Sequence, residues 1–226
     1  GGPHPTVVPG EPVAHGFDLS LAGEGEHAIR QIARFCDGDG SLDAIPGLST
    51  PNSGGLPAQS IGNLDELPYP HEGYETFDLG MYNPDGGSVV PGGLMTSRGC
   101  PARCTFCANY VTGRIYRYRS SQSIVEEMRH LRAEYGINTF PFWDDAFTAL
   151  RPRLRELCDA IVAESDLDGI TWSCITPGNM IKPADLVRMR EAGCVSVNFG
   201  IESGDPRILK AIQKGQRPDG IRAAVR

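Results

Sequence analysis

The sequence predicts an α/β fold built on a parallel sheet, and three observations favour this class. From residue 93 to residue 214, four apolar segments of strand composition alternate with helical patterns. Polar residues follow directly after several of these segments, as expected where parallel strands end at a ligand site. The 226 residues suffice for one substantial core, and 40% hydrophobic with 22% charged residues is a globular composition. Alternating strands and helices join through right-handed crossovers, which makes the sheet parallel.

Residues 1–40 are expected to close an α/β domain. Residues 1–6 are predicted to be a loop leaving an upstream strand, and residues 17–21 have strand composition. After Gly23-Glu24-Gly25-Glu26, a helix of about ten residues is predicted. Its apolar face contains Ile29, Ile32, Ala33 and Cys36. Because the chain lacks an initiator Met, we expect a fragment of a longer protein.

Residues 41–90 are predicted to be an inter-domain linker, with a plain irregular loop as the alternative. They are rich in Gly, Pro, Asn and Ser, with turn signals such as Pro46-Gly47 and Pro84-Asp85-Gly86-Gly87. Residues 1–90 carry 2 basic and 13 acidic residues, a net charge of -11, whereas residues 91–226 carry 19 basic and 15 acidic residues, a net charge of +4. The charge therefore changes where a second domain, residues 91–226, is expected to begin.

The second domain is predicted to contain four strand–helix units. Strands are expected at residues 93–97, 137–143, 170–175 and 195–201. The helices that follow them are expected from the capping box at Ser123, from near Pro152, over residues 184–191 and over residues 207–214. The first helix carries the apolar stripe Ile124, Met128, Leu131 and Tyr135. The chain is expected to stop inside a further helix at Arg226.

Three cysteines follow the first of these strands, at Cys100, Cys104 and Cys107. Their x3 and x2 spacing lets three thiolates face one centre, and three thiolates on a 4Fe-4S cluster leave one iron open to a substrate. Zinc is the alternative, but it needs a fourth ligand nearby. The available side chains, His71, His130 and Cys158, stand in unrelated contexts. Cys36, Cys158, Cys174 and Cys194 are predicted to be buried packing thiols.

The chain shows no sign of a membrane or nucleic-acid partner. No apolar run approaches the length needed to span a bilayer, and no signal peptide is recognisable. Seven cysteines without a compact disulfide pattern suit a reducing cytoplasm. The net charge of -7 argues against non-specific nucleic-acid binding. The alternating arginines and tyrosines of residues 113–119 are accordingly interpreted as a solvated or cofactor-facing loop rather than an RNA-binding strip.

The motif Cys100-x3-Cys104-x-Phe106-Cys107 resembles that of the radical S-adenosylmethionine (SAM) superfamily. The resemblance implies a (βα)6-type barrel, of which the first four units are present. It implies that SAM chelates the open iron through its amino and carboxylate groups. An electron from the reduced, oxygen-sensitive cluster then cleaves SAM to methionine and a 5′-deoxyadenosyl radical. A reductant such as flavodoxin or ferredoxin is implied as a partner.

The resemblance also assigns cofactor-binding residues. The aromatic residue of the motif is Phe106. Asp144 and Asp145 stand where family members face the SAM amino group, although many carry Gly-Gly-Glu there; helix capping is the alternative. Glu202 and Ser203 are expected at the ribose hydroxyls or the methionine moiety, with a purely structural turn as the alternative. No catalytic residue is assigned.

Gly1-Gly2-Pro3-His4 and Gly23-Glu24-Gly25-Glu26 resemble the end of a Rossmann-like cobalamin-binding domain, which precedes the barrel in one large radical SAM subfamily. Residues 61–70 resemble the inter-domain segment of that subfamily. The resemblance implies that Gly1 and Gly2 lie near the nucleotide tail of cobalamin.

The activity implied is methyl transfer from methylcobalamin to an unactivated carbon or phosphorus centre of a small molecule or natural product. Within enzymes the alternatives are a cobalamin-associated cyclase and a tRNA methylthiotransferase. The latter would need a second cluster-bearing domain, against which Gly23-Glu24-Gly25-Glu26 argues. A non-catalytic zinc or iron-sulfur module is the alternative from another class.

Overall fold

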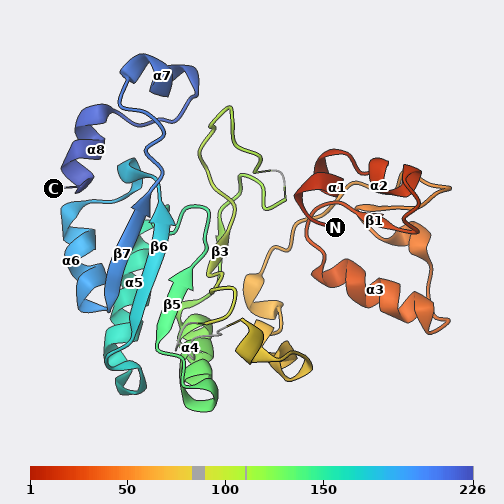
Figure 1. The fold of residues 1–226 in the computed structure, drawn as a ribbon, viewed down its shortest axis with the longest axis horizontal. Helices are drawn as coiled ribbons and strands as arrows, with labels where there is room; N and C mark the ends of the chain where they lie inside the picture. Colours follow the sequence, from red (N-terminus) through yellow and green to blue (C-terminus); the bar gives the residue numbers. More distant parts are fainter. Residues whose placement is uncertain (83–89, 110, 226) are drawn as a thin grey trace. The chain divides into compact units, whose positions relative to one another are not determined.

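The computed structural model describes residues 1–82, 90–109 and 111–225, and the chain divides into two compact units (Figure 1). The first unit comprises Gly1–Gly62 with Ala108–Arg114, and the second comprises Asn63–Cys107 with Ile115–Arg226. The predicted turn at Pro84-Asp85-Gly86-Gly87 lies outside the described residues. The predicted domain limits at residues 40 and 90 stay predictions.

The first unit is small and contains three helices and one short strand pair among its described residues. The helices are α1 (Pro3–Val7), α2 (Glu11–Ala14) and α3 (Glu26–Cys36), and the strands are β1 (Ser20–Leu21) and β2 (Leu48–Ser49), which pair antiparallel. Ala28, Ile45 and Leu48 form its core, with Leu21 and Ile32 packed against them. A 3-10 turn, Leu42–Ala44, precedes β2.

Two expectations for this unit are wrong. The predicted loop at residues 1–6 is helical from Pro3, because proline at the first helical position has its φ already set for a helix. In α3 Ala28 is buried and Ile32, four positions further on, is half-buried against the core, whereas Ile29 and Cys36 are exposed. The helix is rotated by about one residue from the predicted face, because only a thin core is available for it to cover.

The second unit is organised around a parallel sheet in the order β5-β6-β7, which confirms the α/β class. The strands are β5 (Thr139–Phe142), β6 (Thr171–Thr176) and β7 (Cys194–Phe199). Leu94 forms an isolated parallel bridge with Phe142, so the chain before the cysteines runs along β5. Of the predicted strand at residues 93–97, only Ser97 lies in a strand, β3 (Ser97–Arg98), which pairs antiparallel with β4 (Arg117–Tyr118). The full barrel stays a prediction.

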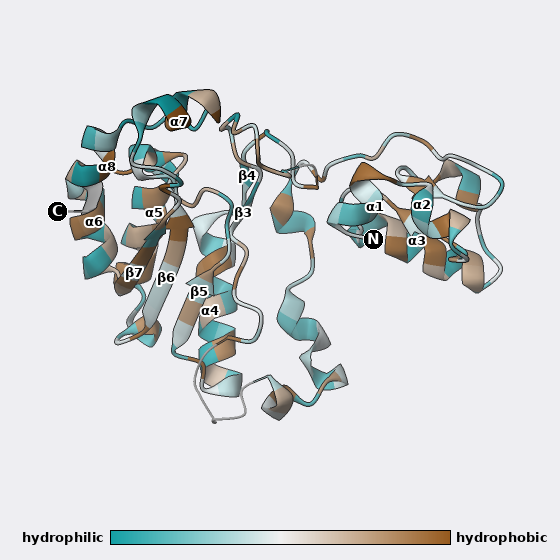
Figure 2. Cartoon of the chain, turned by 45° about the horizontal axis from the view of Figure 1, so that its top comes forward, coloured by the Kyte–Doolittle hydropathy of each residue, from teal (hydrophilic) through white to brown (hydrophobic). Residues whose placement is uncertain are grey.

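The helices between the strands carry the core of the unit. They are α4 (Ser121–Tyr135), α5 (Arg151–Ala163) and α6 (Pro183–Glu191). Ile124, Met128 and Leu131 are fully buried on α4, which confirms its predicted stripe. Strands β5, β6 and β7 are largely brown or white in the hydropathy colouring of Figure 2. Buried and half-buried residues alternate along β5 and β6, whereas no residue of β7 is buried. Cys158 and Cys174 are buried as predicted, and Cys194 is half-buried.

Two local predictions in this unit are wrong. Helix α4 begins three residues before the predicted capping box, because the Ser120 side chain caps it by accepting a hydrogen bond from the Ser123 N–H at 3.2 Å. Arg119 is buried and ion-paired with the buried Glu127, so it is not a solvated or cofactor-facing residue.

Residues 63–82, within the predicted linker, pack against the rest of the second unit. Three 3-10 helices, Leu64–Glu66, Pro70–Thr76 and Leu79–Met81, cover part of the second unit. Asp65 accepts hydrogen bonds from the Ser120 N–H, and Tyr74 joins the core. Beyond β7, helices α7 (Pro206–Ala211) and α8 (Pro218–Val225) complete the described chain. No helix in the described ranges has the length and apolarity to cross a membrane.

Candidate functional site

The three motif cysteines lie on a loop that leaves β3. None forms a disulfide; Cys100 and Cys104 are half-buried and Cys107 is exposed. Gly99 opens the loop with a φ of 86°, and the Cys107 N–H donates to the Cys104 carbonyl at 3.3 Å. Within residues 1–82, 90–109 and 111–225, no three Cys, His, Asp or Glu side chains are arranged to hold a metal ion. The donor chemistry nevertheless fits an iron-sulfur cluster, since three reduced thiols share one short loop.

The start of this loop is tied to the end of β5 by Asp144. Oδ1 of Asp144 accepts from the N–H groups of Thr96 and Ser97 at 2.6 and 3.0 Å. Oδ2 accepts from the Ser97 hydroxyl at 2.8 Å and from the Thr96 hydroxyl. Asp144 is only 1% exposed, so both carboxylate oxygens are used inside the protein.

Arg153 on α5 supports the same contact. Its Nη2 donates to the Thr96 hydroxyl at 2.6 Å and to the Thr96 carbonyl at 3.1 Å. Burial raises the pKa of the Asp144 carboxyl, while the charge of Arg153 and the hydrogen bonds from Thr96 and Ser97 lower it, with a net increase. Asp144 therefore positions Thr96 and Ser97, which precede the cysteine loop. Its predicted contact with a cofactor stays a prediction.

Asp145 differs from its neighbour in burial. It is exposed, because successive residues after β5 keep the alternation of a strand. Burial raises the pKa of the Cys100 thiol, and the Asp145 carboxylate raises it further, so Asp145 lies close to the cysteine loop. Of the two predicted carboxylates, Asp144 is therefore the buried one and Asp145 the exposed one.

Glu202 lies in the loop after β7 and is paired with a lysine that sequence reasoning missed. Its φ is 63°, in the left-handed region that non-glycine residues rarely occupy. Oε1 of Glu202 lies 2.8 Å from Nζ of Lys214. The Lys214 ammonium also lies 5.7 Å from the ring centroid of Phe106, the motif aromatic, in a cation–π contact. Phe106, predicted to meet the cofactor, and Glu202 thus share one cation.

Ser203 has a local structural contact. Its hydroxyl accepts a hydrogen bond from the Asp205 N–H at 3.1 Å, and Asp205 in turn caps α7 through the Arg207 N–H at 2.7 Å. The serine therefore shapes the approach to α7, and its predicted contact with a cofactor stays untested by these hydrogen bonds.

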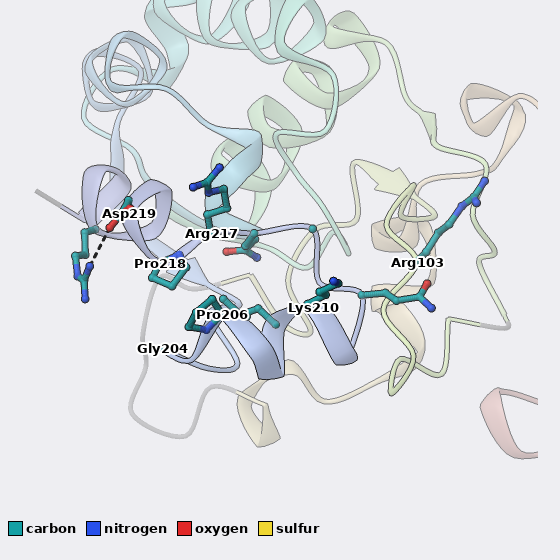
Figure 3. A pocket seen from close by; sticks show the side chains of 12 residues that line it. Arg103, Gly204, Pro206, Lys210, Arg217, Pro218 and Asp219 are labelled. Atoms are coloured by element: carbon teal, nitrogen blue, oxygen red, sulfur yellow. Dashed lines mark hydrogen bonds and ion pairs between the residues drawn. The ribbon is translucent and has the colours of Figure 1, made fainter.

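A pocket of about 870 Å³ adjoins α7 and the start of α8 (Figure 3). Its lining includes Arg103 of the cysteine loop together with Lys210 and Arg217. Gln216, also in the lining, is buried, and its Oε1 has no hydrogen-bond partner among the described residues. None of the predicted site residues lines this pocket.

The first unit has its own pocket, of about 360 Å³, beside Gly1. Two histidines, His4 and His15, and the exposed ring of Phe17 contribute to its lining. Ser20 also lines it; the hydroxyl is buried and has no partner in the described part of the chain. Gly2, with a φ of 106°, is not among the lining residues. The buried Ser20 hydroxyl could form a hydrogen bond with a polar group of a ligand bound beside Gly1.

The sequence also hides Thr96, Arg153 and Lys214. Thr96 lies within the predicted strand at residues 93–97 and Lys214 ends the predicted helix at residues 207–214, but nothing local marks either as a site residue. Arg153 sits in the first turn of a helix otherwise read for its apolar stripe. Of the three, Arg153 alone carries a sequence signal: it is a charged residue at a helical position that is buried, which is unusual without a partner.

Comparison with known proteins gives one matching family and several relatives. The family described as the radical SAM superfamily matches residues 94–226. An uncharacterized methyltransferase of Pyrococcus horikoshii is 36% identical over 225 residues, which are 96% of this chain and 48% of the relative. Cytidylyl-2-hydroxyethylphosphonate methyltransferase of Streptomyces wedmorensis is 40% identical over 164 residues, 68% of this chain and 29% of the relative. An anaerobic magnesium-protoporphyrin IX monomethyl ester cyclase of Synechocystis is 28% identical over 217 residues, 93% of this chain and 42% of the relative.

The solved structures with a similar fold include the cobalamin-dependent S-adenosylmethionine radical enzyme OxsB with aqua-cobalamin and S-adenosylmethionine bound. The TM-score is 0.79 at 21% sequence identity, over 98% of this chain and 33% of that chain. This likeness concerns the fold. The chain spans about half the length of its curated relatives, or less.

Proposed function

The chain belongs to the radical SAM superfamily, and on this basis we propose that its protein is a cobalamin-dependent methyltransferase that cleaves SAM at a 4Fe-4S cluster. One observation carries the proposal: the matched region holds the three-cysteine loop, tied by Asp144 to the carboxyl end of a parallel sheet. Ligands of α/β folds bind at that end. Cys100, Cys104 and Cys107 are the proposed iron ligands.

When bound, the reduced cluster supplies the electron that splits SAM into methionine and a 5′-deoxyadenosyl radical. The protein residues bind and orient the cofactor. Asp145, whose charge acts on Cys100, is proposed to accept hydrogen bonds from the SAM amino group. Oε2 of Glu202 has no hydrogen-bond partner among the described residues and suits a ribose hydroxyl. Phe106 and Ser203 are proposed to complete the cofactor contacts.

Cobalamin is proposed to bind next to Gly1 and Gly2, in the remnant of a Rossmann-like domain. The pocket beside Gly1 and the orphaned hydroxyl of Ser20 support this assignment. A residue with a Cβ at Gly1 would meet the Leu21 carbonyl at 3.5 Å, an ordinary contact, so the glycine gives only modest extra room. The similarity in fold to a cobalamin-dependent enzyme is consistent with a cobalamin site in this unit.

Methyl transfer is proposed because two of the relatives are named methyltransferases. The cyclase relative keeps cyclisation as a second candidate. We propose a small-molecule or natural-product substrate, a flavodoxin or ferredoxin as reductant, and a cytoplasmic location.

Anaerobic reconstitution with iron and sulfide tests the proposal. We expect about four irons and four sulfides per chain, and release of methionine and 5′-deoxyadenosine from SAM after dithionite is added. Stoichiometric zinc without charge-transfer absorption would contradict the radical chemistry. SAM cleavage without transfer of a labelled methyl group to any product would leave the cyclase candidate.

A further inference from the structure

Lys214 lies between the two parts of the chain that the proposed function assigns to SAM and to the cluster. Its side chain is only 9% exposed. Nζ contacts Oε1 of Glu202 at 2.8 Å on one side and faces the ring of Phe106 on the other, at 5.7 Å from the centroid. A cation that is largely removed from water needs such partners, and both of its partners belong to the proposed site.

The end of α7 delivers this lysine by a specific backbone turn. The Lys214 N–H donates to the Leu209 carbonyl at 3.0 Å, and the Gln213 N–H donates to the Lys210 carbonyl at 3.1 Å. This is the Schellman pattern of a helix end. Gln213 occupies the left-handed position with a φ of 52°, although it is not a glycine. The turn is therefore maintained against a local conformational cost, as is the backbone of Glu202.

The same turn holds the cysteine loop. The carbonyl of Ile212, left free at the end of α7, accepts a hydrogen bond from the Thr105 N–H at 3.0 Å. Thr105 lies between Cys104 and Phe106. One turn thus contacts the loop twice, through the Ile212 carbonyl and through the Lys214 side chain.

Gly200 leaves the space in which the ion pair forms. A Cβ on Gly200 would lie 3.1 Å from Nζ of Lys214 and 3.2 Å from Oε1 of Glu202, tighter than nearly all real contacts. Its carbonyl accepts a hydrogen bond from Nε2 of Gln216 at 2.9 Å. The end of β7 is therefore packed against the chain on both sides of Lys214.

We propose that Lys214 is a positioning residue that couples the Glu202 carboxylate to the cluster loop. By holding Oε1, Lys214 fixes the orientation of the carboxylate and leaves Oε2 for the ligand, and through Phe106 it fixes the loop that carries the cysteines. The proposal rests on the proposed function in one respect, the role of Glu202 as a SAM ligand. It predicts that the effect of Lys214 on SAM affinity depends mainly on Glu202, whereas its effect on the cysteine loop does not.

SAM affinity is the first test, measured on anaerobically reconstituted protein. Lys214→Met should weaken SAM binding about tenfold, as expected for loss of a charge-assisted contact, with iron content unchanged. Lys214→Arg should recover most of the affinity, because a guanidinium can pair with the carboxylate and stack on the ring. Lys210 is an exposed lysine of α7 itself, and Lys210→Met should bind SAM within twofold of the unchanged protein.

A double variant separates positioning from direct contact. In a Glu202→Gln background, Lys214→Met should change SAM affinity by less than about twofold, because the carboxylate that Lys214 holds is gone. A further tenfold loss in that background would mean that Lys214 acts independently of Glu202 and would overturn the proposal.

Hydrogen exchange of the Thr105 amide, measured on the protein without cofactors, tests the contact between Lys214 and the cysteine loop independently of SAM binding. Lys214→Met should speed exchange of the Thr105 amide about tenfold, whereas Lys210→Met should not. Faster exchange at Thr105 in a protein that never binds SAM would support the coupling to the loop while contradicting the proposed function. Unchanged Thr105 exchange together with unchanged SAM affinity in Lys214→Met would overturn the assignment of Lys214.

Discussion

Thr96 and Asp144 are joined by two hydrogen bonds: the Thr96 N–H donates to Oδ1 at 2.6 Å, and the Thr96 hydroxyl donates to Oδ2. The two residues lie 48 positions apart, one just before the cysteine loop and the other just after β5. A buried carboxylate without water needs every acceptor position filled, and the chain that precedes the cysteines fills them. The position of the loop therefore depends on this contact.

Asp144→Ala should reduce the free energy of unfolding by about 3 kcal/mol, because the buried donors of Thr96 and Ser97 lose their acceptor. Urea denaturation of the cofactor-free protein measures this. Asp145→Ala is the matched control, since the neighbouring carboxylate is exposed, and it should cost less than about 1 kcal/mol. Equal stability of the two variants would show that the Asp144 contacts do not hold the loop.

Alanine at Cys100, Cys104 or Cys107 should abolish the cluster, because each thiolate is expected to bind one iron. Iron and sulfide analysis after anaerobic reconstitution measures this loss. Cys36→Ala and Cys194→Ala serve as controls and should retain full iron, since one thiol is exposed on α3 and the other is half-buried at the start of β7. Cluster loss in either control would point to a different ligand set.

Glu202→Ala should weaken SAM binding about tenfold to a hundredfold while iron content stays unchanged, because the expected partner of the carboxylate is the ribose or methionine end of SAM. Equilibrium binding of SAM and iron analysis are measured on the same preparation. Simultaneous loss of iron and of helical circular dichroism would make Glu202 a structural residue.

Ser20→Ala should lower cobalamin affinity about threefold to tenfold, because the buried hydroxyl would lose a hydrogen bond to the ligand. Titration followed by the cobalamin absorption spectrum measures this. Stability should hardly change, since Ser20 Oγ has no partner among the described residues. An unchanged cobalamin affinity, or a loss of stability alone, would remove Ser20 from the proposed site.

The pH dependence of stability should reveal Asp185, which accepts hydrogen bonds from Arg151 at 2.6 and 3.0 Å. Burial raises the pKa of the Asp185 carboxyl, but the hydrogen bonds from Arg151 and the Lys182 N–H outweigh burial and hold the pKa below its usual range. A carboxylate whose pKa is lower in the folded state stabilises the fold above its unfolded-state pKa of about 3.9. This stabilisation is lost as the pH falls through the folded-state pKa.

Asp185→Asn should therefore cost about 2 to 3 kcal/mol at pH 7, and the difference from the unchanged protein should shrink below about pH 4. Urea denaturation at several pH values between 7 and 3 measures this. A difference that stays constant across that range would mean that the ionised carboxylate contributes nothing.

The cysteine loop and the helices could be predicted because their signals are local. The spacing of Cys100, Cys104 and Cys107 is read within eight residues, and the stripe of Ile124, Met128 and Leu131 within two helical turns. A periodic apolar pattern predicts the buried face of a helix correctly when a large core is available, because the apolar face then packs against that core. In α3 that core is thin, and the predicted face was wrong.

Neighbouring residues with the same chemistry could not be told apart from the sequence. Asp144 and Asp145 are both carboxylates after one strand, yet one is buried by hydrogen bonds from a segment 48 positions earlier and the other is exposed. The alternation along a strand separates them only once the register of that strand is known.

The sequence by itself determined that this chain carries a three-thiol loop at the edge of an α/β sheet and belongs with radical SAM proteins. Both conclusions depend on residues that are adjacent in the sequence, so no knowledge of the path of the chain is needed. Only the tertiary structure decided which charged groups meet there. Lys214 reaches Glu202 and Phe106 because a helix end and a loop converge on the cysteine segment. Such contacts depend on the path of the chain in space, and a buried charge accepts only the partner that this path brings within hydrogen-bond distance.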